Sequence, residues 1–448
     1  MTNPSDLYPL SLDDAEMAPE RALLLGRMIG RSFKNVSIGM DSNPSSTMIK
    51  NSLMTGLLSA GAHIKDLGVI PTPAMVLSSS SGCMIAVGEP NEQGVLSGIR
   101  LMYPDGSMFT LDQIKQIIRA ADGDRRLPGY KDVGILHHSD SAIRNYIDAM
   151  IKRHASCNES PVILDCGCGC TSLCTPQILA SLGADLVTID AQPDMKYCSR
   201  PPGIEEADLS ILSGMVKGNV GNIGIALNGD GTRLALIDES GNYVRPDRVL
   251  SLILLYLKPT SLVIPVNMSS VVNDALNDLI GDGISTPYKA HSERVVIRTD
   301  NDLDSIIAAM KENNAEIGAL GNGTIIYSDV GMCPDAINTA AILSKMAGEN
   351  SIKNLLGSFP KYLVLNDSVR LSGNPDLFGR KLSEKLSELD TEEIWQIDGW
   401  RVEMTNGWFT VSSNNKDPGR IDITAESKDR AYAVSMMELA KDIVRECI

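Results

Sequence analysis

The chain has 448 residues, and at about 150 residues per domain this length predicts roughly three domains and excludes a single small binding module. Lysine and arginine number 40 against 56 aspartate and glutamate residues, so the formal net charge is −16. A chain this acidic repels a nucleic-acid backbone and an anionic membrane. We therefore expect neither nucleic acid nor membrane among its partners.

Three further features predict a cytoplasmic protein. The longest apolar run, Val249–Leu257, is too short to span a bilayer. No basic residue precedes Arg21, so the N-terminus does not match a signal or transit peptide. The 9 cysteines are too few in a chain of this length to form a disulfide scaffold, and we expect them to be reduced thiols.

The first part of the chain alternates short β-branched runs with longer segments of helical periodicity. Strands are predicted at residues 36–40, 62–67, 82–87 and 98–102. Helices are predicted at residues 10–29, 47–60, 74–80 and 111–121. Ser11 and Asp14 form a capping box for the first of these helices, and Ser45 or Ser46 caps the second. This alternation is typical of an α/β domain, which we assign to residues 1–153.

The same alternation returns twice. Strands are predicted at residues 162–165, 185–190, 222–227, 234–238 and 261–266, and helices at 175–182, 205–217, 269–280, 302–313 and 336–346. These elements define domains over residues 154–257 and 258–356. After Gly348 the pattern changes to three strand signals and helices at 376–386 and 428–446, which predicts a domain over residues 357–448. The expected fold class is α/β, with three similar mixed α/β domains and a smaller C-terminal α+β domain.

Short loop motifs follow these elements in a definite order. They are LGVIPTP at Leu67–Pro73, SGIR at Ser97–Arg100, NGDGTR at Asn228–Arg233, IDESG at Ile237–Gly241, GNGTII at Gly321–Ile326, IDGW at Ile397–Trp400, Trp408, and ITAE at Ile423–Glu426. In this order the motifs resemble those of the α-D-phosphohexomutase superfamily, which includes phosphoglucomutases, phosphomannomutases and phosphoglucosamine mutases. The resemblance covers nearly the whole chain, and the GNGTII segment is similar to the archaeal form of the family's sugar-binding loop.

The resemblance implies four domains around a central cleft to which each domain contributes a loop. It also implies a reaction in which a phosphoserine gives its phosphoryl group to a phosphosugar and then takes the other phosphoryl group back. That reaction requires a hydroxyl nucleophile, a magnesium ion on oxygen ligands, and cationic groups that hold two phosphates.

The residue that aligns with the nucleophilic serine is Gly88. This follows when Gly82–Ile85 is aligned with the start of the family's GxMITASHNP motif. Glycine has no side chain to carry a phosphoryl group, and the following loop, Glu89–Gly94, is acidic where a phosphate would have to lie. The hydroxyls available as substitutes are Ser97 and the run Ser78–Ser81.

The metal loop retains one of three expected aspartates. Asp230 is present, but Asn228 and Thr232 occupy the other two ligand positions. Because magnesium is held by charge and octahedral oxygen geometry, binding of Mg²⁺ is expected to be weak or absent.

Other binding loops depart from the family as well. Leu320 or Ala319 stands where the sugar loop has a glutamate, and the basic residues of the first-domain GRDxR motif are replaced by Met40 and Asn43. The arginine of the C-terminal RPSGTEP clamp is also missing. We expect a phosphorylated sugar or a similar small anion to bind through Arg100, Arg233, Gly321, Asn322, Ser412, Ser413, Asn415 and Lys416.

Four cysteines form a CxCxCxxxC cluster, namely Cys166, Cys168, Cys170 and Cys174. This spacing is compatible with a thiolate metal or iron–sulfur site. The segment also matches a glycine-rich strand-to-helix turn of the family in which small residues fit, so the preferred interpretation is packing.

These departures predict a catalytically degenerate phosphohexomutase homologue that binds a phosphosugar or acts in regulation. One alternative is an active, magnesium-dependent phosphoglucomutase, phosphomannomutase or phosphoglucosamine mutase with relocated catalytic residues. A second alternative is a structural subunit that pairs with an active paralogue or forms a homo-oligomer. The sequence leaves the preferred hexose open.

Overall fold

The computed structural model describes residues 11–12, 19–79, 82–88, 97–121, 128–154, 160–201, 203–219, 221–277, 294–371, 375–413 and 419–448. The chain forms two compact units. One unit contains Met1–Val249 and Asn322–Asn354, and the other contains Leu250–Gly321 and Leu355–Ile448. Within the described residues, no helix combines the length and apolar character needed to cross a membrane.

The first sheet of the first unit has a parallel centre and an antiparallel edge. In spatial order its strands are β1 (Ser11–Leu12), β5 (Ser97–Met102), β4 (Cys83–Val87), β2 (Asn35–Met40), β3 (His63–Val69) and β6 (Leu136–His138). Strands β4, β2, β3 and β6 are parallel, whereas β5 and β1 run antiparallel to their neighbours. Because the parallel strands point the same way, the loops that follow β2 and β4 meet at one edge of the sheet.

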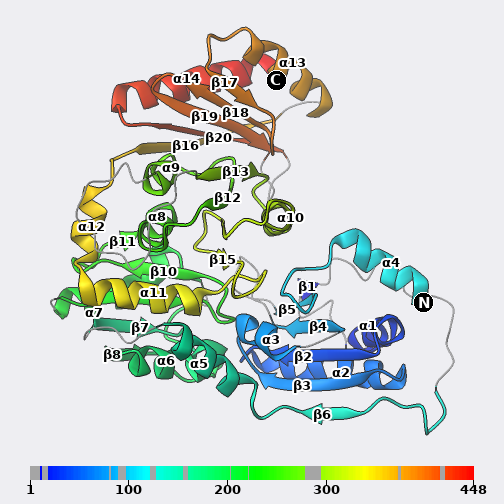
Figure 1. Ribbon diagram of the computed structural model, residues 1–448. Coiled ribbons are helices and arrows are strands. Elements are labelled where there is room, and N and C mark those ends of the chain that lie inside the picture. The colour runs from blue at the N-terminus through cyan, green and yellow to red at the C-terminus, as the bar shows by residue number, and fades with distance from the viewer. Residues whose placement is uncertain are drawn as a thin grey trace. The chain divides into compact units, whose positions relative to one another are not determined.

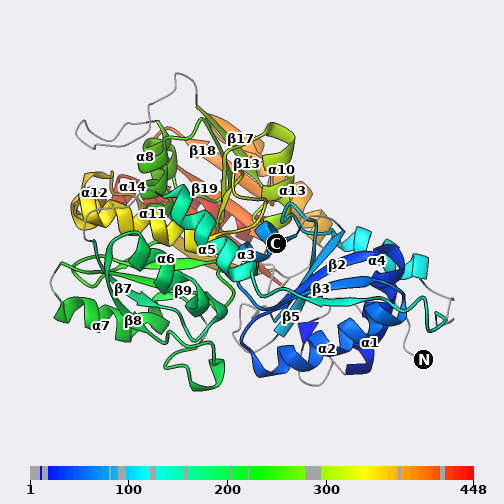
Figure 2. The ribbon, with the colours of Figure 1, turned by 60° about the horizontal axis from the view of Figure 1, so that its bottom comes forward.

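Helices cover this sheet. They are α1 (Pro19–Ser32), α2 (Pro44–Ser59), α3 (Thr72–Ser78) and α4 (Leu111–Ala121). Helix α5 (Ala142–Arg153) follows β6 and packs against α3. Helices α1 and α2 pack against each other, and their apolar faces join β2–β5 in one hydrophobic core (Figures 1 and 2). Asn43 caps α2 by accepting a hydrogen bond from the Ser45 backbone N–H, and Pro44 follows it. The prediction that Ser45 or Ser46 caps this helix is therefore wrong.

The predicted helix over residues 10–29 is also wrong at its start. Ser11 and Leu12 form β1, in which Leu12 pairs with Ser97 of β5, and the helix begins at Pro19. The apolar spacing of the sequence is that of a helix, but the backbone of these residues pairs with β5, which lies 85 positions further along the chain. Asp14 of the predicted capping box lies outside the described residues.

The second sheet repeats the design of the first. In spatial order its strands are β11 (Tyr243–Val244), β10 (Leu234–Ile237), β9 (Ile223–Leu227), β7 (Ser160–Asp165) and β8 (Ala184–Ile189). Strands β9, β7 and β8 are parallel, and β10 and β11 complete an antiparallel edge. The accompanying helices are α6 (Thr175–Ser181), α7 (Ser210–Gly218) and α11 (Ala336–Glu349), with short 3-10 turns at Cys170–Leu173, Met195–Tyr197 and Glu206–Leu209. The first unit also contains β15 (Ile325–Tyr327).

The second unit contains a parallel sheet and an antiparallel one. Strands β13 (Val295–Thr299), β12 (Ser261–Pro265) and β14 (Ile317–Ala319) lie in that order and are parallel. Near them along the chain are α8 (Pro246–Leu257), α9 (Val271–Leu276), α10 (Leu303–Asn313) and α12 (Ile352–Ser358). The antiparallel sheet has the order β16 (Leu363–Arg370), β20 (Arg420–Ser427), β19 (Gly407–Ser413), β18 (Trp400–Met404) and β17 (Glu393–Trp395).

Two helices, α13 (Pro375–Ser387) and α14 (Arg430–Cys447), pack on the antiparallel sheet and close its core (Figure 1). The predicted α/β class, with three similar parallel-centred sheets and a final α+β segment, is confirmed. The described residues of the last segment form five strands, whereas the sequence signalled three. The four domain boundaries remain a prediction.

Candidate functional site

The candidate site in the first unit begins where β2 and β4 end. Asp41 follows β2 and Gly88 follows β4, and the Asp41 N–H donates to the Val87 carbonyl at 2.9 Å. The Gly88 N–H donates to the Gly98 carbonyl on β5 at 2.7 Å. The parallel strands thus bring Asp41 next to the aligned nucleophile position, and β5 brings Arg100 to the same edge.

Gly88 lies in a space where an added side chain would displace its neighbours. Its φ is +102°, which favours glycine, and an added Cβ would lie 2.0 Å from Asp41 Oδ1 and 2.3 Å from Ser46 Oγ. Those two atoms are themselves hydrogen-bonded, with Ser46 Oγ donating to Asp41 Oδ1 at 2.6 Å. A carboxylate and a hydroxyl of this chain therefore occupy the position that a serine at residue 88 would need.

Asp41 is a buried carboxyl that sequence reasoning missed. Its side chain is 4% exposed, and Oδ1 also accepts from the Asn43 N–H at 2.9 Å. Oδ2 is buried and has no hydrogen-bond partner among the described residues. Burial raises the pKa of Asp41 to about 7, although the hydrogen bonds from Ser46 and Asn43 act in the opposite direction. The available signal was its position directly after a buried strand, within the segment aligned with GRDxR.

Arg100 connects three of the loop motifs. Its Nη2 atom donates to Asp230 Oδ2 at 2.5 Å and to Thr72 Oγ1 at 3.0 Å. The Thr72 N–H donates in turn to the Asp230 carbonyl at 2.9 Å. Arg100 is 9% and Asp230 3% exposed, so this is a buried ion pair.

The loop around Asp230 is saturated with hydrogen-bond donors. Asp230 Oδ1 accepts from Asn228 Nδ2 at 2.8 Å, from Thr232 Oγ1 at 2.6 Å and from the Thr232 N–H at 3.1 Å. Asn228 Oδ1 accepts from the backbone N–H groups of Thr232 and Arg233, which turns its NH₂ group toward Asp230. Both oxygens of the single carboxylate are therefore engaged by donors of the chain.

A small cavity lies among these groups. Its volume is about 10 Å³, and its lining includes Asp41, Thr72, Gly88, Arg100 and Asp230. This volume holds about one water molecule. The structure thus brings Gly88, Arg100 and Asp230 together, as expected from their motifs, and packs them closely.

Other predicted residues of the first unit lie near the same loop. The Arg233 N–H donates to Asn228 Oδ1, and the Leu234 N–H donates to the Gly323 carbonyl at 3.2 Å. Asn322 Oδ1 accepts from the Thr324 N–H, so its amide shapes the turn. Gly321 belongs to the second unit and is exposed.

The substitute hydroxyls named from the sequence are only partly described. Ser97 is the first residue of β5, and its side chain is outside the described part of the structure. Ser78 Oγ donates to the Ala74 carbonyl within α3 at 3.1 Å, which is a helix-internal role. Ser80 and Ser81 lie outside the described residues.

In the second unit, Ser412 and Ser413 end β19 and line a cavity of about 330 Å³. Asp398, Gly399 and Trp400 line the same cavity. Asn415 and Lys416 of the predicted anion site lie outside the described residues.

The tryptophan and the glutamate of the last motifs contact each other. Trp408 Nε1 donates to Glu426 Oε1 at 2.8 Å and to Ser270 Oγ at 2.9 Å. The guanidinium of Arg401 lies 3.9 Å from the centre of the Trp408 ring. These residues are buried, and their contacts join β18–β20 to the start of α9.

The four cysteines of the CxCxCxxxC segment are all buried, but they do not form a common ligand group in the described part of the chain. Cys170 Sγ donates to the Gly229 carbonyl at 3.0 Å, and Cys174 Sγ donates to the Thr171 carbonyl at 3.7 Å. Burial raises the pKa of both thiols. The Cys170 and Cys174 thiols thus lie in the interior and donate to backbone carbonyls, whereas Cys168 faces a different group of side chains.

Comparisons with known proteins identify the family. The family models for domains I and II of phosphoglucomutase/phosphomannomutase match residues 11–126 and 144–241. The chain is 30% identical over 437 residues to a protein of Methanocella arvoryzae named "Probable phosphoglucosamine mutase", covering 96% of this chain and 95% of that protein.

Solved structures share the fold. A phosphoglucomutase/phosphomannomutase family protein of Burkholderia thailandensis superposes with a TM-score of 0.85 at 19% identity, covering 100% of this chain and 98% of the other. An Aspergillus fumigatus N-acetylphosphoglucosamine mutase, solved in complex with GlcNAc-6P and magnesium, gives a TM-score of 0.54 at 12% identity, covering 92% and 82% of the two chains. Loop order, sheet design and full-length sequence identity agree: the chain belongs to the α-D-phosphohexomutase superfamily.

Proposed function

We propose that this phosphohexomutase-family protein binds a phosphorylated hexose or hexosamine and does not carry a phosphoryl group on residue 88. The observation that carries the proposal is the packing around Gly88, where Asp41 Oδ1 would lie 2.0 Å from any Cβ. A phosphoserine mechanism needs a hydroxyl at that point, with open space for a phosphoryl group beyond it. Here the space is taken by a carboxyl group and a serine that are hydrogen-bonded to each other.

We further propose that the Asp230 loop does not bind magnesium. Bound magnesium supplies positive charge that stabilises the transferring phosphoryl group, and it requires several oxygen ligands. The loop offers one carboxylate, whose Oδ2 pairs with Arg100 and whose Oδ1 accepts from Asn228 and Thr232. The donor set does not fit the ion, because Asn228 turns its NH₂ group, which cannot bind a cation, toward the Asp230 carboxylate.

The ligand class follows from the relatives and from the remaining donors. Two relatives, matched over 96% and 97% of this chain, are named "Probable phosphoglucosamine mutase", so a hexosamine 6-phosphate is the first ligand to test. Because the net charge is −16, an anionic ligand needs local donors to overcome the overall repulsion. The donors proposed for it in the first unit are Arg233 and Asn322, and those proposed in the second unit are Ser412 and Ser413. Asn415 and Lys416, which lie outside the described residues, remain candidates from the sequence.

A second candidate function is an active phosphoglucosamine mutase with a relocated nucleophile. The observation that favours it is 30% identity across 96% of the chain with a protein of that name. Ser97, which follows the loop aligned with the nucleophile, is the hydroxyl proposed for the role.

One experiment separates the two functions. The purified full-length chain is incubated with glucosamine 6-phosphate, Mg²⁺ and a trace of glucose 1,6-bisphosphate, and product is followed by ³¹P NMR while intact mass reports covalent phosphate. We expect a rise in unfolding temperature with millimolar glucosamine 6-phosphate, no glucosamine 1-phosphate, and no added phosphate. Turnover, or a phosphate mapped to Ser97, would establish the active mutase instead. The absence of any thermal shift, with glucose 6-phosphate and mannose 6-phosphate tested in parallel, would leave the structural-subunit alternative.

A further inference from the structure

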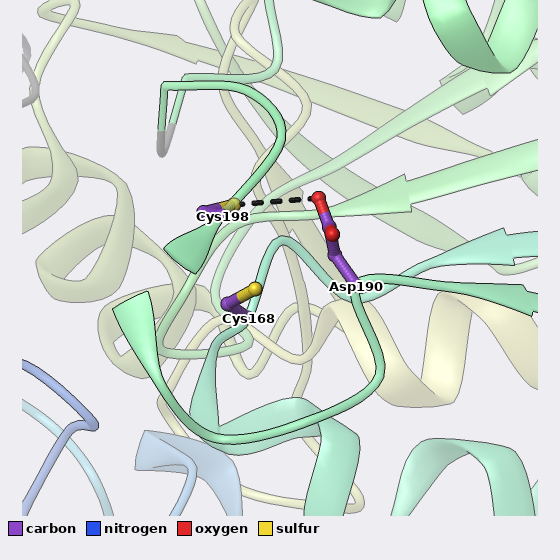
Figure 3. Close-up of side chains that lie close together, drawn as sticks. All are labelled: Cys168, Asp190 and Cys198. Atoms are coloured by element: carbon purple, nitrogen blue, oxygen red, sulfur yellow. Dashed lines mark hydrogen bonds between the residues drawn. The ribbon is translucent and has the colours of Figure 1, made fainter. Parts of the chain in front are cut away.

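Three metal-ligating side chains meet at the carboxyl end of β7 and β8. Cys168 lies in the turn after β7, Asp190 directly follows β8, and Cys198 follows the short 3-10 helix Met195–Tyr197. Their ligand atoms all lie within 4.8 Å of one another. Figure 3 shows the Cys168 and Cys198 sulfurs and the Asp190 carboxylate gathered on one side of the loop that joins them.

The spacing suits a tetrahedral ion. A zinc ion at about 2.3 Å from sulfur and about 2.0 Å from oxygen separates two such ligands by about 3.5 Å and two sulfurs by about 3.8 Å. Cys198 Sγ already lies 3.5 Å from Asp190 Oδ2. Since no pair in the group exceeds 4.8 Å, closure around an ion requires each pair to contract by about 1.3 Å or less.

The backbone and neighbouring side chains hold this arrangement. The Cys168 N–H donates to the Asp190 carbonyl at 2.8 Å, which ties the two loops together. Asp190 Oδ2 also accepts from the Ser199 N–H at 3.0 Å and from Ser199 Oγ at 2.6 Å, so the carboxylate is oriented. Gln192 Nε2 donates to Cys168 Sγ at 3.4 Å, and such outer hydrogen bonds are typical of metal ligands.

We propose that Cys168, Cys198 and Asp190 form a binding site for a thiophilic divalent metal ion, with zinc as the expected ion and a fourth coordination position open to solvent or a ligand. Two thiolates and one carboxylate favour zinc over the harder magnesium ion. Asp190 and Cys198 are partly exposed, which provides an entry path, whereas Cys168 is buried. Three protein ligands with an open fourth position are also the pattern of catalytic rather than closed structural zinc sites.

Binding is coupled to proton release. Zinc binds thiolates rather than thiols, so the incoming ion forms two metal–sulfur bonds, with Cys168 and Cys198, and displaces the two thiol protons to buffer. Because metal binding by cysteine releases protons, it strengthens as pH rises.

The test uses the reduced full-length chain. The protein is equilibrated with zinc and transferred to metal-free buffer, and the zinc content per chain is measured. Cobalt(II) then replaces zinc, and the thiolate-to-cobalt charge-transfer absorption is recorded. We expect about one metal ion per chain with a cobalt spectrum typical of two thiolates. Cys198→Ser should halve the charge-transfer intensity and lower zinc affinity at least about tenfold. Asp190→Asn should lower zinc affinity to a similar extent and leave the charge-transfer intensity unchanged.

Two matched variants serve as controls. Asp194→Asn changes a carboxylate in the same loop, and Cys447→Ser changes a buried cysteine of the other unit; both should retain metal and spectrum. Thermal unfolding of each metal-free variant shows that it is folded. The proposal fails if the parent chain retains no metal at micromolar free zinc, or if the double variant Cys198→Ser/Asp190→Asn binds as tightly as the parent. It also fails if Cys168 and Cys198 are found as a disulfide that excludes zinc.

Discussion

Arg100 Nη2 lies 2.5 Å from Asp230 Oδ2, and both side chains are almost completely buried. The pair joins β5 to the loop around Asp230, two segments of the first unit that are 130 residues apart in the sequence. A guanidinium thus supplies positive charge to the loop that the family resemblance assigns to a metal ion. Because a buried charge depends strongly on its counter-charge, this contact leads to the first prediction.

Removing one partner of the pair should destabilise the first unit strongly. Asp230→Asn removes the carboxylate that pairs with the buried Arg100 charge, and we expect a loss of about 3–5 kcal/mol in unfolding free energy. The double variant Arg100→Met/Asp230→Asn should recover a large part of the loss, because neither charge remains. The three tryptophans all lie in the second unit, so the measurement is hydrogen exchange of first-unit peptides against denaturant.

A solvent-exposed ion pair serves as the control for the buried Arg100–Asp230 pair. Asp442 and Arg445 on α14 are 65% and 56% exposed, and Asp442→Asn should cost no more than about 0.5 kcal/mol. Similar costs at the two sites would contradict the role assigned to the Arg100–Asp230 pair.

Introducing a serine at the aligned nucleophile position should not create a nucleophile. Gly88→Ser places Cβ against Asp41 and Ser46 at a φ of +102°, so we expect strain from the backbone and from overpacking together. Gly68→Ser is the matched control, since Gly68 has a φ of +71° but nothing within 4 Å of an added Cβ. Gly88→Ser should cost at least about 2 kcal/mol more than the control.

The same two variants and the parent chain are then treated with glucose 1,6-bisphosphate, and their intact masses are measured by mass spectrometry. We expect the Gly88→Ser variant to gain no more mass than the parent, because the space beyond residue 88 is filled by Asp41 and Ser46. A stable gain of one phosphate at residue 88 would show that the site accommodates the reaction after all.

The stability of the first unit should fall as pH rises from about 4 to about 7. Burial raises the pKa of Asp41 from 3.8 to about 7, so the folded state favours the protonated form. The stabilisation is fully present below the unfolded pKa and is lost as pH rises through the folded pKa, with a total of roughly 4 kcal/mol for a change of this size. Asp41→Asn should flatten this dependence, as measured by denaturant-dependent hydrogen exchange at several pH values.

Asp335 also makes the stability of the first unit fall as pH rises, because burial raises its pKa to about 6. The difference between Asp41→Asn and the parent isolates the Asp41 contribution, since Asp335 is common to both. A pH profile unchanged by Asp41→Asn would mean that Asp41 is ionised in the folded protein throughout this range.

The hydrogen bonds of Trp408 should stabilise the second unit. Trp408→Phe keeps an aromatic ring beside Arg401 but removes the N–H that donates to Glu426 and Ser270. Because Glu426 is buried, the lost donor should cost about 1–3 kcal/mol. Trp400→Phe is the matched control, since Trp400 Nε1 has no hydrogen-bond partner within the described residues. Fluorescence of the remaining tryptophans reports unfolding, and equal losses for the two variants would contradict the assignment.

Local patterns in the sequence were sufficient for the class of fold. Apolar runs such as residues 36–40 and 82–87 became β2 and β4, because a fully buried parallel strand needs apolar residues on both faces. The order of the loop motifs was sufficient for the family, and the alignment of Gly88 placed that residue directly after β4. The strand pattern and the order of the loop motifs depend only on residues that are close together in the sequence, so they can be read before the fold is known.

Contacts between distant segments were decided only in the tertiary structure. Ser11 and Leu12 form a strand rather than a helix because β5 offers them backbone partners. The pairing of Arg100 with Asp230 joins residues separated by 130 positions. Cys168 was predicted alongside its sequence neighbours, yet the fold turns it toward Asp190 and Cys198 at the ends of adjacent parallel strands. Burial and partner identity arise from packing, so the sequence by itself determined which residues were available, and only the folded chain determined which of them meet.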